Sequence, residues 1–214
     1  MIQEGYSPPF FYFKKKLGLL ELFVVIISKV KRRQNMQKYF VFLFLLVIVI
    51  SFSENLEDFL YNYMVDLYNV PCQIAELITP VIIKDSEEFG LDPLLITAIF
   101  QHESRFKNVY GDDGDAVGIP QLHEDAVYYV CAFYPEIREK VKEINGHANL
   151  IKYPVLQVQI AIRYFYLIQR NLELSTLEAI GKYNGRDDMY NIYTAKVISE
   201  YASILLAYEE YKIK

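Results

Sequence analysis

The carboxyl group of Glu103 stands where a surface carboxylate is not expected. Leu95, Ile99 and Glu103 are each four residues apart, so in a helix Glu103 continues the apolar stripe that faces the core. Apolar surroundings raise the pKa of a carboxyl group, which makes it an effective general acid near neutral pH. The stretch also ends close to Glu103, so periodicity alone leaves open a carboxylate that points into water.

The other residues capable of chemistry do not form a metal site. The chain has two cysteines and three histidines: Cys72, Cys131, His102, His123 and His147. They lack the spacing of zinc ligands. The thiols could pair in an oxidising compartment, although unpaired buried thiols are commoner. The acidic stretch over residues 111–115 lacks the alternating ligands and distal glutamate of a calcium loop and is interpreted as a solvated turn. No metal and no cofactor are predicted.

Five short motifs follow one another along the chain. The first two are FGLDPLLITAI (residues 89–99) with the pair Glu103-Ser104, and AVGIPQL (residues 116–122), in which Gln121 comes 18 residues after Glu103. The third is a helical pattern that comprises Pro154, Gln157, Val158, Ala161, Tyr164 and Phe165. The last two are Ala179 with YNG (residues 183–185), and Tyr193 with Val197. In this order the motifs resemble those of the soluble lytic transglycosylase (SLT) domain family, in the lysozyme-like superfamily, over roughly residues 74–205.

The resemblance implies an activity on peptidoglycan glycan strands. Glu103 would be the catalytic acid and base, Ser104 would support it, and Gln121, Tyr183 and Asn184 would line the sugar cleft. The implied reaction cleaves the β-1,4 bond between N-acetylmuramic acid and N-acetylglucosamine and leaves a 1,6-anhydro end. It needs one carboxyl group, because the N-acetyl group and the 6-hydroxyl of the substrate replace the second carboxylate of ordinary glycosidases. Without this resemblance, Tyr183 would be interpreted as a core tyrosine at a helix end and Gln121 as a surface residue of a helix.

Four residues depart from the family's motifs. Pro120 replaces Met, Arg186 replaces the second Gly, Asp115 stands where Gly is usual, and Asp112 falls near a frequent cleft Ser. The first three affect loop backbone, so we expect an altered cleft shape around an unchanged acid. The chain also has 19 Tyr and no Trp, so sugar stacking falls to Tyr or Phe.

Two other functions remain open. Goose-type lysozymes share the fold and the lone glutamate but hydrolyse the bond, with an acid from a neighbouring loop that holds water. Asp112, Asp113 and Asp115 are candidates for such an acid. A wall-binding or assembly component without turnover is the second alternative, because Pro120 and Arg186 alter the motifs.

Helical periodicity runs through the chain from residue 54 onward, with no sustained strand alternation. Asp92 and Pro93 are typical of a helix start, Gly90 ends the helix before it, and Pro80 starts or kinks that earlier helix. Helices are predicted over residues 74–89, 93–103, 121–133, 135–143, 154–171, 176–183 and 190–210. The predicted fold is a mainly α, lysozyme-like single domain with little or no sheet.

Charge divides the chain into an N-terminal segment and an exported domain. Residues 1–53 carry eight basic and two acidic side chains, a net charge of +6, so residues 54–214 carry 14 basic and 25 acidic ones. Residues 39–50 are apolar, which with Met36 before them and Ser51 and Ser53 after them is typical of a signal peptide that starts at Met36. A retained membrane anchor and a buried helix are the alternatives.

These features predict three parts and an exported location. Residues 1–53 are the export segment, residues 54–72 a linker or helix, and residues 73–214 the transglycosylase-like domain. The acidic domain argues against a nucleic-acid partner. Association with a membrane through the N-terminal segment is expected if that segment is retained, and the oligomeric state is not predicted.

Overall fold

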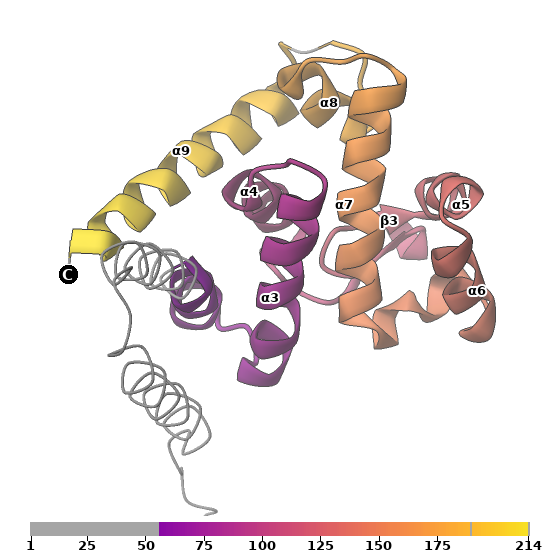
Figure 1. Ribbon diagram of the computed structural model, residues 1–214, viewed down its shortest axis with the longest axis horizontal. Helices are drawn as coiled ribbons and strands as arrows, with labels where there is room; N and C mark the ends of the chain where they lie inside the picture. Colours follow the sequence, from indigo (N-terminus) through magenta and orange to yellow (C-terminus); the bar gives the residue numbers. More distant parts are fainter. Residues whose placement is uncertain (1–55, 189, 214) are drawn as a thin grey trace, which may run out of the picture. The chain divides into compact units, whose positions relative to one another are not determined.

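The structure, a computed structural model, describes residues 56–188 and 190–213, which are mainly helical (Figure 1). The α-helices are α3 (Cys72–Glu88), α4 (Pro93–Ser104), α5 (Glu124–Phe133), α6 (Pro135–Glu143), α7 (Pro154–Asn171), α8 (Thr176–Tyr183) and α9 (Ile192–Ile213). The shorter elements are the π-helix η1 (Tyr63–Leu67), the 3-10 helices η2 (Asp112–Gly114) and η3 (His147–Lys152), and the strands β1 (Tyr110–Gly111), β2 (Ala116–Val117) and β3 (Leu122–His123). The predicted mainly helical, lysozyme-like class with little sheet is confirmed.

The helix boundaries differ from the prediction mainly before α5. That helix begins at Glu124 and not at Gln121, because residues 122–123 pair antiparallel with residues 116–117, and Gln121 turns the chain between them with a φ of 49°. Pro80 lies inside α3, whose first residue is Cys72, and so does not start it. The three antiparallel strands are two residues long each, in the order β1-β2-β3.

Helix α4 lies at the centre of the buried core. Residues 94–100 are all buried, and α4 packs along α9 while α3 packs along α7 (Figure 1). Asp92 caps α4 by accepting a hydrogen bond from the Leu94 amide at 2.8 Å, and Pro93 occupies the first helical position. Helix α4 ends at Arg105, whose left-handed backbone (φ 54°) turns the chain away from the helix axis.

The segment predicted as a linker or helix, residues 54–72, contributes to the same core. Residues 56–62 are helical and continue into η1, and Phe59, Leu60 and Met64 are buried. The Phe59 ring lies 5.0 Å from the ring of Tyr208 on α9, measured between centroids. This packing joins the start of the described chain to its last helix.

The predicted export segment, residues 1–53, lies outside the described residues. Among the helices that the structure does describe, none has the length and apolarity needed to cross a bilayer. Cys72 and Cys131 are both free thiols.

A buried ion pair links α3 to α7. Arg163 Nη1 donates to Asp85 Oδ2 at 2.6 Å, and the exposed fractions of the two side chains are 11% and 7%. The Arg163 guanidinium also lies over the rings of Phe89 and Tyr134. Since neither charge can return to water in the folded state, each depends on the other.

We expect Asp85→Ala to lower the free energy of unfolding by about 3–5 kcal/mol, because it leaves the Arg163 charge buried without its partner. Urea denaturation followed by circular dichroism measures this change. The double variant Asp85→Leu/Arg163→Met should lose much less stability, since it removes both charges. A single variant as stable as the wild type would contradict this account.

Candidate active site

Glu103 occupies the last turn of α4, where the helix leaves the core. Its side chain is half-buried, and Arg105 and Phe106 follow with positive φ values of 54° and 59°. Phe106 is buried and ties the turn to the core. The predicted apolar stripe therefore ends in a carboxyl group at the edge of the core, neither fully dry nor free in water.

The surroundings of Glu103 favour its protonated form. Burial is the largest influence and raises the pKa of the carboxyl group above its ordinary value. Tyr193 opposes this by donating a hydrogen bond to Glu103 Oε1 at 2.5 Å, and the charges of His102 and His123 also lower the pKa. The charge of Asp112 raises it. A carboxyl group whose pKa is raised by burial, and whose charged form accepts a hydrogen bond, can both give and take a proton.

Residues 118–121, between β2 and β3, form a loop beside Glu103 that side chains fix from two sides. Ser104 Oγ donates to the Ile119 carbonyl at 2.7 Å, and the Tyr183 hydroxyl donates to the Pro120 carbonyl at 3.0 Å. Ser104 therefore acts on the loop and not directly on the Glu103 carboxyl group. The position of the loop relative to the acid is thus set by the residue that follows the acid.

Gln157 on α7 fixes the same loop from the core. It is fully buried, accepts from the Ile119 amide at 3.0 Å, and donates to the Leu150 carbonyl at 2.7 Å and to Asn108 Oδ1 at 2.9 Å. A Cβ atom at Gly118 would lie 2.1 Å from Gln157 Oε1, so only glycine fits there, and its φ of 82° also favours glycine. The amide group of Gln157 has its three hydrogen bonds within the protein.

Gln121 holds the turn that it makes. Its Nε2 donates to the Gly118 carbonyl at 2.7 Å and to the Val109 carbonyl at 3.2 Å. Its Oε1 lies against Gly111, where a Cβ atom would come within 1.9 Å. The side chain of Gln121 therefore joins the β1 strand to the loop before β3.

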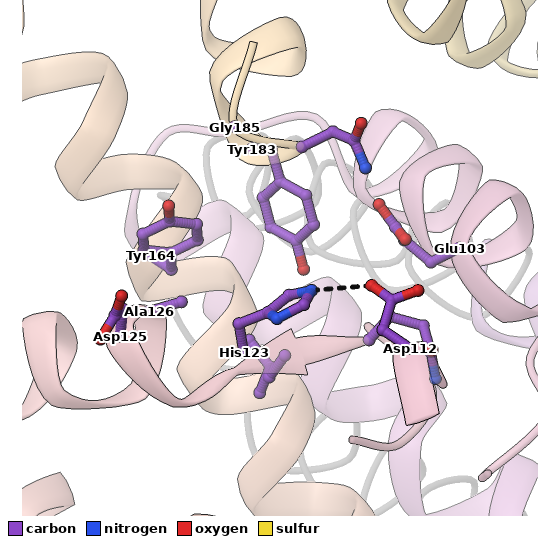
Figure 2. Close-up of a pocket in the computed structure, with 11 residues that line it drawn as sticks. Glu103, Asp112, His123, Asp125, Ala126, Tyr164, Tyr183 and Gly185 are labelled. Carbon is purple, nitrogen blue, oxygen red and sulfur yellow. Dashed lines mark ion pairs between the residues drawn. The ribbon is translucent and has the colours of Figure 1, made fainter. Parts of the chain in front are cut away.

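A cleft of about 390 Å³ opens beside Glu103. Its walls come from α4, η2, β3, α5, α7 and α8 and comprise Glu103, Asp112, Gln121, Leu122, His123, Asp125, Ala126, Tyr164, Tyr183, Asn184 and Gly185. Figure 2 shows the carboxyl groups of Glu103 and Asp112 pointing into this cleft, with the Tyr183 ring between them and Tyr164. Tyrosines supply the aromatic wall, as the absence of Trp from the sequence requires.

Asp112 and His123 form an ion pair within the cleft. His123 Nε2 lies 3.2 Å from Asp112 Oδ2, and both side chains are largely exposed (Figure 2). Asp112 and Asp113 have positive φ values of 46° and 56°, a conformation that aspartate tolerates better than most residues. No group of three or more His, Cys, Asp or Glu side chains is placed to hold a metal ion anywhere in residues 56–188 and 190–213.

Four of the five predicted site residues meet in this cleft: Glu103, Gln121, Tyr183 and Asn184. The fifth, Ser104, lies behind it on Ile119. Arg186, one of the departures from the family's motif, donates through Nε to Asn184 Oδ1 at 3.3 Å. The cleft thus retains its predicted residues despite the substituted loops.

Sequence reasoning assigned no role to Tyr193, Gln157, Tyr164 or His123. The first three stand in motifs that the resemblance covers. Which of them would touch Glu103 or the loop depends on the packing of α7 and α9 against α4. His123 gave no signal, because its partner Asp112 lies across a hairpin whose register the sequence did not predict.

We expect Tyr193→Phe to raise the pKa of Glu103 further, because it removes a hydrogen bond that stabilises the carboxylate. NMR titration of a chain labelled at the glutamate carboxyl carbon measures this shift. Tyr201→Phe is the matched control, since Tyr201 is also on α9 and donates to a carboxylate, that of Asp92, outside the cleft. An unchanged or lowered Glu103 pKa in Tyr193→Phe would contradict the assignment.

Comparison with known proteins agrees with this geometry. A scan against family profiles matches the transglycosylase SLT domain over residues 80–197, which includes Glu103, the loop, Tyr183 and Tyr193. A search among curated proteins found no match. The match spans more than half of the chain, from within α3 to within α9. The chain therefore belongs to the transglycosylase SLT domain family, which acts on peptidoglycan.

Proposed function

We propose that this chain is a peptidoglycan lytic transglycosylase in which Glu103 is the only catalytic acid and base. The observation that best supports this proposal is the half-buried carboxyl group of Glu103, whose pKa is raised. It accepts a hydrogen bond from Tyr193 and lines a cleft with tyrosines in its wall. The substrate bond is the β-1,4 link between N-acetylmuramic acid and N-acetylglucosamine. Gln121, Tyr183 and Asn184 contact the sugars.

In the first step, protonated Glu103 gives its proton to the glycosidic oxygen. The bond between that oxygen and C1 of the muramic acid breaks, and the N-acetyl carbonyl oxygen of the same sugar stabilises the positive centre at C1. Burial supports this step because it raises the pKa of Glu103 and so favours the protonated form that gives the proton.

In the second step, the Glu103 carboxylate takes the proton of the 6-hydroxyl of the muramic acid. The 6-oxygen then bonds to C1, which closes the 1,6-anhydro ring and restores protonated Glu103. The Tyr193 hydrogen bond supports this step, since it stabilises the charged form that the first step leaves behind. No water is consumed.

The site of action follows from the substrate. Peptidoglycan lies outside the cytoplasmic membrane, so we propose that the chain is exported, with residues 1–53 as signal peptide or membrane anchor. Both the acidic domain and peptidoglycan are anionic, so binding depends on short-range contacts with the sugars and on screening by salt.

We expect Glu103→Gln to lower peptidoglycan clearing by about 10²- to 10⁴-fold, because the amide group of glutamine cannot give or take the catalytic proton. The variant should still bind the polymer. Turbidity of a peptidoglycan suspension measures clearing, and cosedimentation measures binding. Glu88→Gln, an exposed residue of α3, is the control and should clear like the wild type. Unchanged clearing by Glu103→Gln would refute Glu103 as the acid. Binding without clearing by the wild type would identify a wall-binding component.

A goose-type hydrolase is the second candidate, and Asp112 is the observation that favours it. Its carboxyl group lines the cleft with Glu103 and is paired with His123, an arrangement that could hold and polarise a water molecule. In such a site this water molecule, activated by Asp112, would bond to C1 in place of the 6-hydroxyl oxygen, while Glu103 protonates the leaving oxygen.

The products separate the two reactions. We expect mass spectrometry of digested glycan strands to show anhydro ends, each lighter by one water than a reducing end, in both the wild type and Asp112→Asn. Reducing ends from the wild type that disappear in Asp112→Asn would establish the hydrolase and overturn the proposed transglycosylase.

A further inference from the structure

A second carboxylate, Glu200, lies on the face of α9 that packs against α4. Tyr193, Val197, Glu200 and Ile204 recur at spacings of three and four residues, and all except Glu200 are buried. This repeats the pattern of Glu103, a carboxylate that continues an apolar stripe. Glu200 also lies outside residues 80–197, the region matched by the family.

The partner of Glu200 is the residue beside the catalytic acid. His102 Nδ1 lies 3.1 Å from Glu200 Oε1, and the exposed fractions of the two side chains are 19% and 28%. The His102 ring in turn stands edge-on to the Tyr193 ring, with centroids 4.9 Å apart and planes at 81°. Contacts therefore run from Glu200 through His102 and Tyr193 to Glu103.

The stability gained from packing does not explain why a glutamate occupies position 200. Its Oε2 atom is buried and has no hydrogen-bond partner among the described residues. Buried acceptors without a partner destabilise a fold, whereas an apolar residue would fill the same stripe without this cost. The charge of Glu200 also reaches Tyr63, whose phenol pKa is raised mainly by burial and in part by Glu200.

We propose that His102, held in place by Glu200, is a positioning residue that fixes the Tyr193 ring so that its hydroxyl stays on Glu103. The proposal rests on the function proposed above for Glu103. During that reaction Glu103 alternates between neutral and charged forms, and the hydroxyl of Tyr193 must stay within hydrogen-bond distance of it in both. A ring held on its edge by an anchored imidazole cannot swing away when the acid is neutral.

The arrangement also places a second charge beside Glu103. The charge of His102 favours the carboxylate form of Glu103 and so lowers its pKa. The groups that act on Glu103 are His102 on its own helix, Tyr193 on α9, Tyr183 on α8, Asp112 in η2 and His123 on β3. Those facing His102 are Glu103, Tyr193 and Glu200. Removal of the imidazole should therefore raise the pKa of Glu103 and move the alkaline limit of activity to higher pH.

The test compares His102→Gln, Glu200→Gln and the double variant in the full-length chain on a soluble peptidoglycan oligosaccharide. We expect each single variant to lower kcat about tenfold with KM within about twofold, and the double variant to lose no more than the worse single one, because the two residues act as a unit. His102→Gln should also move the alkaline limb upward.

Asp85→Asn is the matched control, since it weakens another buried ion pair between helices without touching the cleft. It should lower the melting temperature and leave the pH profile in place. Additive losses of kcat, with an unmoved alkaline limb in His102→Gln, would overturn the proposal and make the pair merely structural.

NMR titration of the Glu103 carboxyl carbon provides a readout that does not depend on turnover. A higher Glu103 pKa in His102→Gln supports the proposal even if the wild type digests no peptidoglycan, an outcome that would instead refute the proposed function. Normal digestion by the wild type with an unmoved Glu103 titration in His102→Gln would refute this inference alone.

Discussion

The packing of α4 against α9 is the constraint on which the site depends. It places Glu103 at the margin of the core, where burial raises the pKa of the carboxyl group, and brings the Tyr193 hydroxyl within 2.5 Å of Glu103 Oε1, where it stabilises the charged form of the same group. The two effects oppose each other, and the proposed reaction needs both, since one group must act first as acid and then as base. Helix packing thus fits one carboxyl group for both proton transfers of the proposed reaction, in which the N-acetyl group and the 6-hydroxyl of the substrate replace the second carboxylate of ordinary glycosidases.

The loop over residues 118–121 lies beside this acid and contributes Gln121 to the cleft. Ser104 and Tyr183 hold its carbonyl groups, Gln157 holds an amide from the core, and Gln121 closes the turn. Each anchor comes from a different part of the chain, so the loop keeps its place although Pro120 departs from the family's motif. Of the four departures from the family's motifs, Asp112 lines the cleft, whereas Asp115, Pro120 and Arg186 do not.

Local patterns predicted most of the helix bounds, and the resemblance of the motifs to a family singled out Glu103 as the acid. Contacts between distant segments could not be predicted from either. The bounds of α6, α7 and α8 agree with the predicted ranges 135–143, 154–171 and 176–183. The start of α5 was misplaced because the pairing of residues 122–123 with residues 116–117 is a tertiary feature of a very short sheet. Likewise, apolar spacing put Glu103 on the core-facing stripe but left open whether its carboxyl group points into water. The contacts of Tyr193, Gln157 and His102 depend on which faces of α7 and α9 pack in the core. No local pattern contains that information.

Digestion of peptidoglycan by the full-length chain in ¹⁸O-labelled water tests the central claim most directly. Because the 6-hydroxyl of the substrate takes the place of water, the account predicts that the new muramic acid ends carry no ¹⁸O. Incorporation of one ¹⁸O atom at each new end would contradict it and show that Glu103 works with a water molecule.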